Sequence, residues 1–112
     1  PRDHARGVRV HAPISMRDVP ATLLDLAGVS GHALPGTSLA ALWRGAAPPA
    51  GPLLSEVAQA PGVDPRYEVA KGDMSSVVTG GFHLIVGAND HEQLFDLRND
   101  PLERHDLLQG KR

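Results

Sequence analysis

The chain has 112 residues, enough for one domain or a piece of one and for a single modest core. Its formal net charge is -2, from 11 basic and 13 acidic residues without a long run of either sign, so it lacks the basic footprint of a nucleic-acid-binding protein. No apolar stretch approaches the roughly 20 residues of a membrane span. Cysteine is absent, which excludes disulfides and thiolate chemistry but leaves the cellular compartment open.

The opening residues, PRDHARGVRVHAP, are basic and contain no apolar targeting segment. Such residues are unusual at the start of a natural domain and more typical of the interior of a protein chain. We therefore expect the chain to be a fragment or cleaved product of a longer one. Within residues 1–14, Val8 and Val10 alternate with polar neighbours, which predicts a short strand.

A helix is predicted over about residues 15–27. One apolar stripe recurs there at helical spacing: Val19, Leu23, Leu26 and Ala27. Ser15 opens a capping-box pattern, although Pro20 fits the first turn better if Asp18 is the N-cap. Gly28 then supplies a left-handed stop.

A shorter helix is predicted over about residues 37–43 and ends at Gly45. The following stretch, AAPPAGP at residues 46–52, is typical of a spacer because its proline and glycine residues favour neither helix nor strand.

The remainder of the chain, residues 53–112, is expected to form an antiparallel subdomain. Four runs are rich in strand-forming residues: 53–57, 75–79, 82–86 and 93–97. Gly80-Gly81 between two of these runs predicts a two-residue hairpin turn. Residues 58–74 are expected to be a loop, and a turn at Asn99-Asp100-Pro101 leads into a final helical turn over 102–108. The predicted class is therefore α+β, a small antiparallel sheet of about four strands with packed helices.

The stretch LFDLRNDPLERHDL, residues 94–107, raises the question of a metal or acid/base site, because it gathers four acidic residues and a histidine. The spacing of its acids fails the EF-hand pattern. His105-Asp106 is a poor base and orienter, since adjacent side chains rarely bond in that geometry and no nucleophile is near in sequence. We favour structural roles: Asp100 caps the final turn, while Glu103 and Arg104 are solvated.

No other stretch supplies a recognisable site. The nucleotide-binding glycine patterns and the G-x-S-x-G nucleophile pattern are absent, and the six histidines do not pair at ligand spacing. We therefore assign no catalytic, cofactor-binding or metal-binding residue in this chain.

LFDLRNDPLERHDL resembles the C-terminal signature of the sulfatase family, the arylsulfatase-like part of the alkaline phosphatase superfamily, commonly written ELYDLxxDPxExxNL. Phe95 stands for the tyrosine, and Asp106-Leu107 replaces Asn-Leu. Three further segments resemble family elements in the same order: ISMRDVPATLLDLAGV at 14–29, GTSLAALWRG at 36–45 and VVTGGFHLIV at 77–86. Thr79 and His83 stand where the family commonly has Arg and Lys, which leaves the subfamily open.

The resemblance implies a domain organisation. Residues 1–45 would be the closing segment of a large α/β domain, 46–52 a spacer, and 53–112 the C-terminal subdomain of the sulfatase-like fold. The implied partner is the missing N-terminal catalytic domain, with a sulfate ester as substrate of the parent enzyme. In that setting the apolar helix stripe packs on the large domain, and without it the stripe is exposed and invites self-association.

The resemblance also implies where the chemistry lies. Sulfatases use a formylglycine made from Cys or Ser in a (C/S)-x-(P/A)-x-R motif and a divalent metal, usually Ca2+. The motif is absent from this sequence, so both groups are expected in the parent and neither in this chain. The polar loop 58–74, with Arg66, Tyr67 and Lys71, is the expected contribution to the rim of the substrate cleft. Two alternatives stay open: a free-standing structural or interaction module, and the tail of a phosphate or phosphonate ester hydrolase of the same superfamily.

Overall fold

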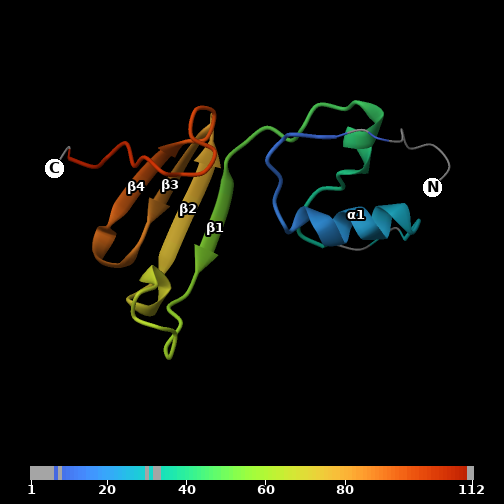
Figure 1. The fold of residues 1–112 in the computed structure, drawn as a ribbon. Coiled ribbons are helices and arrows are strands. Elements are labelled where there is room, and N and C mark those ends of the chain that lie inside the picture. The colour runs from blue at the N-terminus through green and yellow to red at the C-terminus, as the bar shows by residue number, and fades with distance from the viewer. Residues whose placement is uncertain (1–6, 8, 30, 32–33, 111–112) are drawn as a thin grey trace. The chain divides into compact units, whose positions relative to one another are not determined.

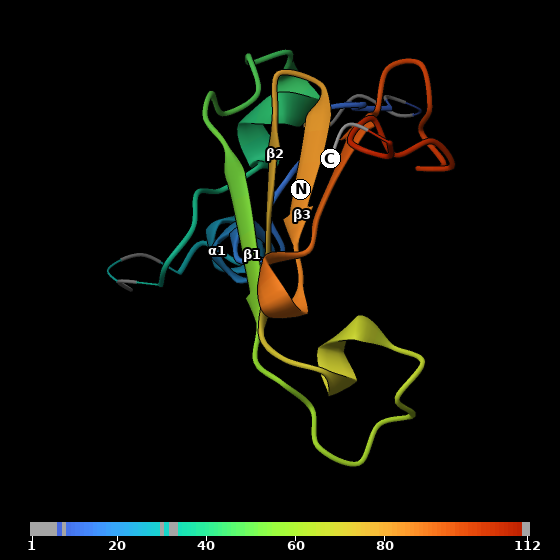
Figure 2. The same cartoon turned by 90° about the vertical axis from the view of Figure 1, so that its left-hand side faces the viewer.

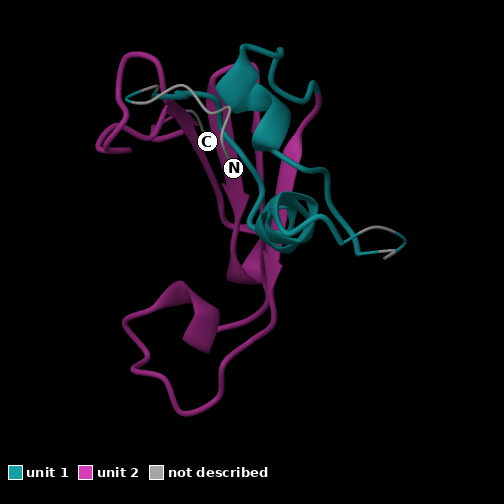
Figure 3. Ribbon diagram, turned by 90° about the vertical axis from the view of Figure 1, so that its right-hand side faces the viewer, with its two compact units in different colours: residues 1–50 teal, residues 51–112 magenta. Residues whose placement is uncertain are grey.

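The computed structural model describes residues 7, 9–29, 31 and 34–110. Within that part of the chain, one α-helix is followed by a sheet of four strands, with short 3-10 helices in the connections (Figure 1). This confirms the predicted α+β class. The chain divides into two compact units, residues 1–50 and residues 51–112, which are coloured separately in Figure 3.

The α-helix of the first unit, α1, runs from Asp18 to Leu26. It ends as predicted: Gly28 has a φ of 71°, and the amide groups of Gly28 and Val29 donate to the carbonyls of Asp25 and Leu24. These two bonds form a Schellman motif, which satisfies carbonyl groups that the last turn leaves unpaired. The predicted N-cap is wrong by one residue, because Arg17 occupies that position and its side chain makes no capping bond.

The Asp18 carboxylate instead bonds to a residue that is distant in the sequence. Its Oδ1 atom accepts a hydrogen bond of 2.9 Å from the backbone N–H of Thr37. One turn further, the Oγ1 atom of the buried Thr22 donates to the Asp18 carbonyl at 2.6 Å and accepts from the Leu39 N–H at 2.9 Å. The polar side of α1 therefore holds the entry to the second helix in place.

That second helix is the 3-10 helix η1, Ala40–Arg44, which ends at Gly45 with a φ of 85°. The Oγ atom of Ser38 donates to the Asp25 carboxylate at 2.5 Å and accepts from the Ala40 N–H at 3.3 Å. The core of this unit is small, and its buried apolar side chains are Leu39, Ala40 and Leu42.

The second unit is an antiparallel sheet in the order β1-β2-β3-β4 (Figures 1 and 2). Its strands are β1 Leu53–Val57, β2 Met74–Thr79, β3 Phe82–Val86 and β4 Glu92–Asp96. The Gly80-Gly81 hairpin is confirmed, since both glycines have positive φ and Thr79 pairs with Phe82 across the turn. Connections between the strands include the 3-10 helices η2, Glu68–Ala70, and η3, Ala88–Asp90.

Two predicted elements are wrong. Val8 lies outside the described residues, and residues 9–11 around Val10 form no strand. Residues 102–108 form turns without a helix, because Glu103 adopts a left-handed backbone with a φ of 53° that interrupts any helical run. Among the described residues, every helix is too short or too polar to cross a membrane.

Candidate functional site

The stretch after β4 follows the sheet edge as an irregular segment, residues 97–110, which we name the C-terminal strap. Asp106 anchors it, because its Oδ1 atom accepts from the backbone N–H of Leu94 at 3.0 Å and of Leu108 at 2.9 Å. The Leu107 N–H donates to the Leu94 carbonyl at 2.8 Å. Leu94 thus receives from the strap both of the bonds that a neighbouring strand would give it.

The other aspartates of the signature shape turns. Asp96 Oδ1 accepts from the Arg98 N–H at 3.0 Å, and its Oδ2 accepts from the Asn99 side chain at 2.7 Å. The Asn99 bond is the main reason why the pKa of the Asp96 carboxyl lies below its usual value. Burial raises the pKa of Asp100, but the N–H groups of His105 and Arg104 and the nearby His105 ring together hold it below the usual value. The prediction that Asp100 accepts backbone N–H groups is confirmed by its 2.7 Å bond from His105.

The prediction that Glu103 is solvated is wrong. Its Oε1 atom lies 2.8 Å from the Nδ1 atom of His83 on β3, and the two side chains are only 35% and 18% exposed. The pair ties the strap to the sheet and accompanies the unusual left-handed backbone of Glu103. The ring of His105 is an exposed side chain whose Nδ1 atom lies 3.5 Å from the Asp100 carboxylate.

A polar hollow of about 500 Å³ lies between β4 and the strap. It is lined by charged and amide side chains that include Gln93, Arg104 and Gln109, and its floor includes the buried Phe95. Among the described residues, no group of three or more His, Asp or Glu side chains is placed to hold a metal ion.

The connection between β1 and β2 projects beyond the ends of these strands (Figure 2). Its base is closed by bonds from the Gln59 N–H to Asp73 at 2.7 Å and from the Gln59 side chain to the Ala70 carbonyl at 3.0 Å. The fixed base leaves the intervening residues as a surface loop on a rigid support, which is the usual placement of binding residues.

Two of the three predicted rim residues are paired within this loop. Arg66 contacts Asp64 at 2.8 Å, and Lys71 contacts Glu68 at 2.6 Å. The Arg66 side chain lowers the pKa of Asp64, and the bond to Asp64 raises the pKa of Arg66. Tyr67 is exposed, and the Arg66 side chain is 84% exposed, so both can reach a bound molecule.

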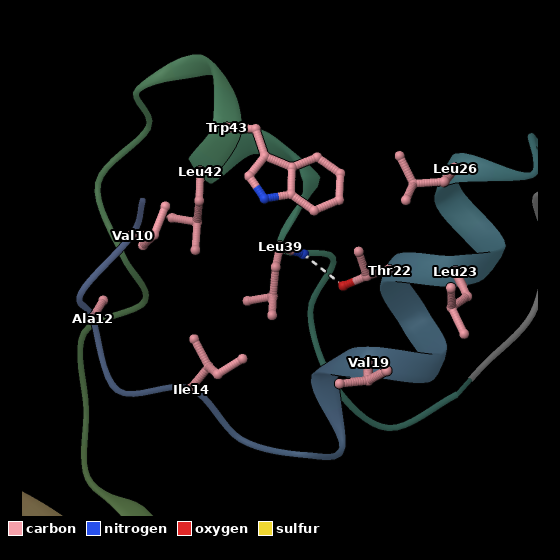
Figure 4. Close-up of a pocket in the computed structure, with 10 residues that line it drawn as sticks. All are labelled: Val10, Ala12, Ile14, Val19, Thr22, Leu23, Leu26, Leu39, Leu42 and Trp43. Atoms are coloured by element: carbon pink, nitrogen blue, oxygen red, sulfur yellow. Dashed lines mark hydrogen bonds between the residues drawn. The ribbon is translucent and has the colours of Figure 1, made fainter. Parts of the chain in front are cut away.

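The first unit contains an open apolar hollow of about 380 Å³ (Figure 4). Residues 10–14, α1 and η1 contribute its lining, with Val19, Leu23 and Leu26 on one side and Trp43 on another. Three members of the predicted stripe, Leu23, Leu26 and Ala27, are exposed, and Val19 is half-buried. Leu23 reaches 61% exposure. Thr22, which no apolar pattern identifies, is the buried residue of this helix.

Four polar residues of the segments that resemble the sulfatase family thus have structural partners: Asp18, Thr22, Asp96 and Asp100. Asp106, which stands where the family commonly has Asn, also has structural partners. The His83–Glu103 pair was missed because the two residues are separated by 20 positions, and neither lies in a local pattern that indicates the other.

Comparisons with known proteins address the fold. A scan against protein-family models finds no match, and a search of curated proteins finds none either. Among solved structures, the chain is similar to the crystal structure of a candidate sulfatase from Bacteroides thetaiotaomicron VPI-5482, with a TM-score of 0.60 and 24% sequence identity. The match covers 83% of this chain and 20% of the other. The chain therefore has a sulfatase-like fold and spans about one fifth of the length of that protein.

Proposed function

We propose that the chain is the C-terminal part of a sulfatase-like sulfuric ester hydrolase, with a structural and cleft-lining role and no catalytic residue of its own. The observation that carries the proposal is the structural likeness to the candidate sulfatase, which includes 83% of this chain. The ordered set of sequence segments that resemble the sulfatase family supports it independently.

The chain's own groups do not fit the chemistry of the proposed parent enzyme. The carboxylates of the signature accept backbone hydrogen bonds at Leu94, Arg98 and His105, so their oxygen atoms serve turns rather than a metal ion. The sequence also lacks the (C/S)-x-(P/A)-x-R motif that supplies formylglycine. Formylglycine and Ca2+ would accordingly be held by residues outside these 112.

Within the parent, the exposed apolar stripe of α1 would pack on the catalytic domain. Leu23 and Leu26 are the largest exposed side chains of that stripe, and burying one leucine contributes about 1.5–3 kcal/mol. The loop between β1 and β2 would border the substrate cleft and present Arg66 and Tyr67 to it. An arginine suits this position because its guanidinium binds oxyanions through two parallel hydrogen bonds.

The substrate class is tested with the product of the complete reading frame that contains these residues. It is expected to hydrolyse 4-nitrophenyl sulfate in the presence of Ca2+, with much lower turnover of 4-nitrophenyl phosphate and of the phenylphosphonate ester. A preference for either phosphorus ester would replace the sulfatase assignment by the alternative reaction of the superfamily. Absence of all three activities, with no (C/S)-x-(P/A)-x-R motif upstream, would favour the interaction module.

The role of the loop is tested in the same protein by replacing Arg66 with alanine. If the guanidinium binds the substrate, Arg66→Ala raises KM about tenfold or more while kcat changes little, since a charge-assisted hydrogen bond contributes about 1.5–3 kcal/mol. Asp64→Asn is the matched control, because it weakens the 2.8 Å ion pair but keeps the guanidinium. Equal KM values for Arg66→Ala and the unmodified enzyme would remove Arg66 from the cleft.

A further inference from the structure

Two connections leave the sheet at the same end. The loop between β1 and β2 joins Val57 to Met74, and these two residues pair with each other. The turn between β3 and β4 begins after Val86, which pairs with Ser75 at the same end of β2. The 3-10 helices η2 and η3 therefore both lie at that end (Figure 2). Both belong to the second unit.

The loop and the turn meet at a glycine. A Cβ atom added to Gly72 would lie 3.0 Å from the Cβ of Ala88 and 3.5 Å from its Cα. Gly72 does not have a positive φ, so its backbone conformation does not demand glycine. The approach of Ala88, which is 8% exposed, is what leaves no room for a side chain at residue 72.

The turn that carries Ala88 has a well-defined backbone. Asn89 and Asp90 both adopt the left-handed conformation, with φ of 58° and 57°. The Gly87 N–H donates to the His91 carbonyl at 2.8 Å, and the His91 N–H donates to the Ala88 carbonyl at 3.3 Å. These bonds close the turn on the end of the sheet, so Ala88 has little freedom to move.

On the loop side, Gly72 follows η2, and backbone bonds connect η2 to the expected rim residues. The Ala70 N–H donates to the Tyr67 carbonyl at 3.0 Å, and the Tyr67 N–H donates to the Asp64 carbonyl at 3.0 Å. Because these bonds join successive turns, a displacement of Gly72 is passed on to Tyr67 and to its neighbour Arg66.

We propose that Ala88 is a positioning residue for the rim of the substrate cleft. Its methyl group sets the closest approach of Gly72, and thereby the place at which the loop presents Arg66 and Tyr67. Ala88 itself does not touch the substrate and acts through the loop. This role rests on the proposed function, in which the two side chains of the loop border the cleft.

Gly72→Ala in the product of the complete reading frame tests this role. Carbon atoms in contact usually lie about 3.5–4.0 Å apart, so the variant would push the loop away from Ala88 by about 0.5 Å. Groups that bind a substrate must be held to within about 0.5 Å. With 4-nitrophenyl sulfate and Ca2+, we therefore expect KM to rise about threefold or more while kcat changes little.

The matched control is the double variant Gly72→Ala, Ala88→Gly, which removes the opposing Cβ atom and should return KM to its original value. A KM that stays raised in the double variant would overturn the role of Ala88. The same holds if Gly72→Ala leaves KM unchanged while Arg66→Ala raises it, because the position of Gly72 then has no effect on the rim.

Hydrogen exchange in residues 64–71 of the same proteins reports on the loop without any enzymatic activity. We expect exchange about threefold or more faster in Gly72→Ala and normal exchange in the double variant. Equal exchange in all three proteins would overturn the contact between Ala88 and the loop and leave the proposed function intact. An unchanged KM in Arg66→Ala would instead remove the loop from the cleft, and the positioning role of Ala88 with it.

Discussion

Replacing Gly36 with alanine should lower the free energy of unfolding of the first unit by at least about 2 kcal/mol. Gly36 has a φ of 113°, a backbone conformation that L residues rarely adopt. An added Cβ would also overlap the carbonyl oxygen of Arg17 and lie 2.8 Å from its carbonyl carbon. The backbone of Arg17 cannot yield easily, because it enters α1 at the residue before Asp18. Urea unfolding followed by the fluorescence of Trp43, the single tryptophan, reports on this unit.

The matched control is Gly28→Ala. Gly28 also has a positive φ, 71°, but no atom outside its neighbours lies within 4 Å of an added Cβ. It therefore measures the backbone strain alone, about 1–2 kcal/mol. If Gly36→Ala costs no more than Gly28→Ala, then the close approach of Gly36 to Arg17 does not contribute to the free energy of unfolding, and residues 36–39 pack only loosely on α1.

Asp106→Ala is expected to cost about 1–3 kcal/mol and to detach the C-terminal strap from β4. The variant leaves the N–H groups of Leu94 and Leu108 without the oxygen atom that accepts them at 3.0 and 2.9 Å. Buried or partly buried N–H groups without an acceptor are costly because water cannot fully replace the lost partner. Hydrogen exchange at the amides of Leu94, Leu107 and Leu108 should accelerate together.

Asp106→Asn separates geometry from charge at the same position. The asparagine side chain keeps an acceptor oxygen at the Oδ1 position, so the strap should stay attached and amide exchange should change little. This expectation also explains why the resembling family signature can carry Asn-Leu where this chain has Asp106-Leu107. Fast exchange in the asparagine variant would show that the negative charge, rather than the acceptor atom, holds the strap.

Local sequence patterns were enough to predict much of the secondary structure of the second unit. The strands at 53–57 and 82–86 have the predicted bounds. Pro52 precedes the first run, and Gly81 and Gly87 flank the second, so these breakers mark three of the four ends. Gly80-Gly81 was sufficient for the hairpin, since a two-residue turn of this kind needs positive φ at both positions. Gly28 marked the end of α1 for the same reason.

The errors share a physical cause, which is a partner distant in sequence. Asp18 looks like a helix cap, yet its carboxylate binds Thr37, 19 positions away. Glu103 looks solvated, yet it binds His83. Residues 102–108 contain helix-forming types but follow the edge of β4, where bonds to Leu94 decide the backbone. A single sequence offers no local pattern for such contacts.

The acidic residues of LFDLRNDPLERHDL suggest a metal or acid/base site by composition. Their positions in the structure instead indicate structural roles. Asp96, Asp100 and Asp106 each accept backbone N–H groups, and Glu103 pairs with a histidine of the sheet. These bonds explain why the stretch identifies the fold so well, since each acid fixes one part of the path from β4 through the strap. The acids contribute to structure, and the proposed hydrolysis requires groups from elsewhere in the parent.

The central claim, a structural segment of a sulfatase-like enzyme without catalytic groups of its own, is tested most directly by one assay. Hydrolysis of 4-nitrophenyl sulfate in the presence of Ca2+ is measured for the purified 112-residue chain and, in parallel, for the product of the complete reading frame. We predict turnover by the complete product and none above the uncatalysed rate by the chain alone. Ca2+-dependent hydrolysis by the chain alone would contradict the account.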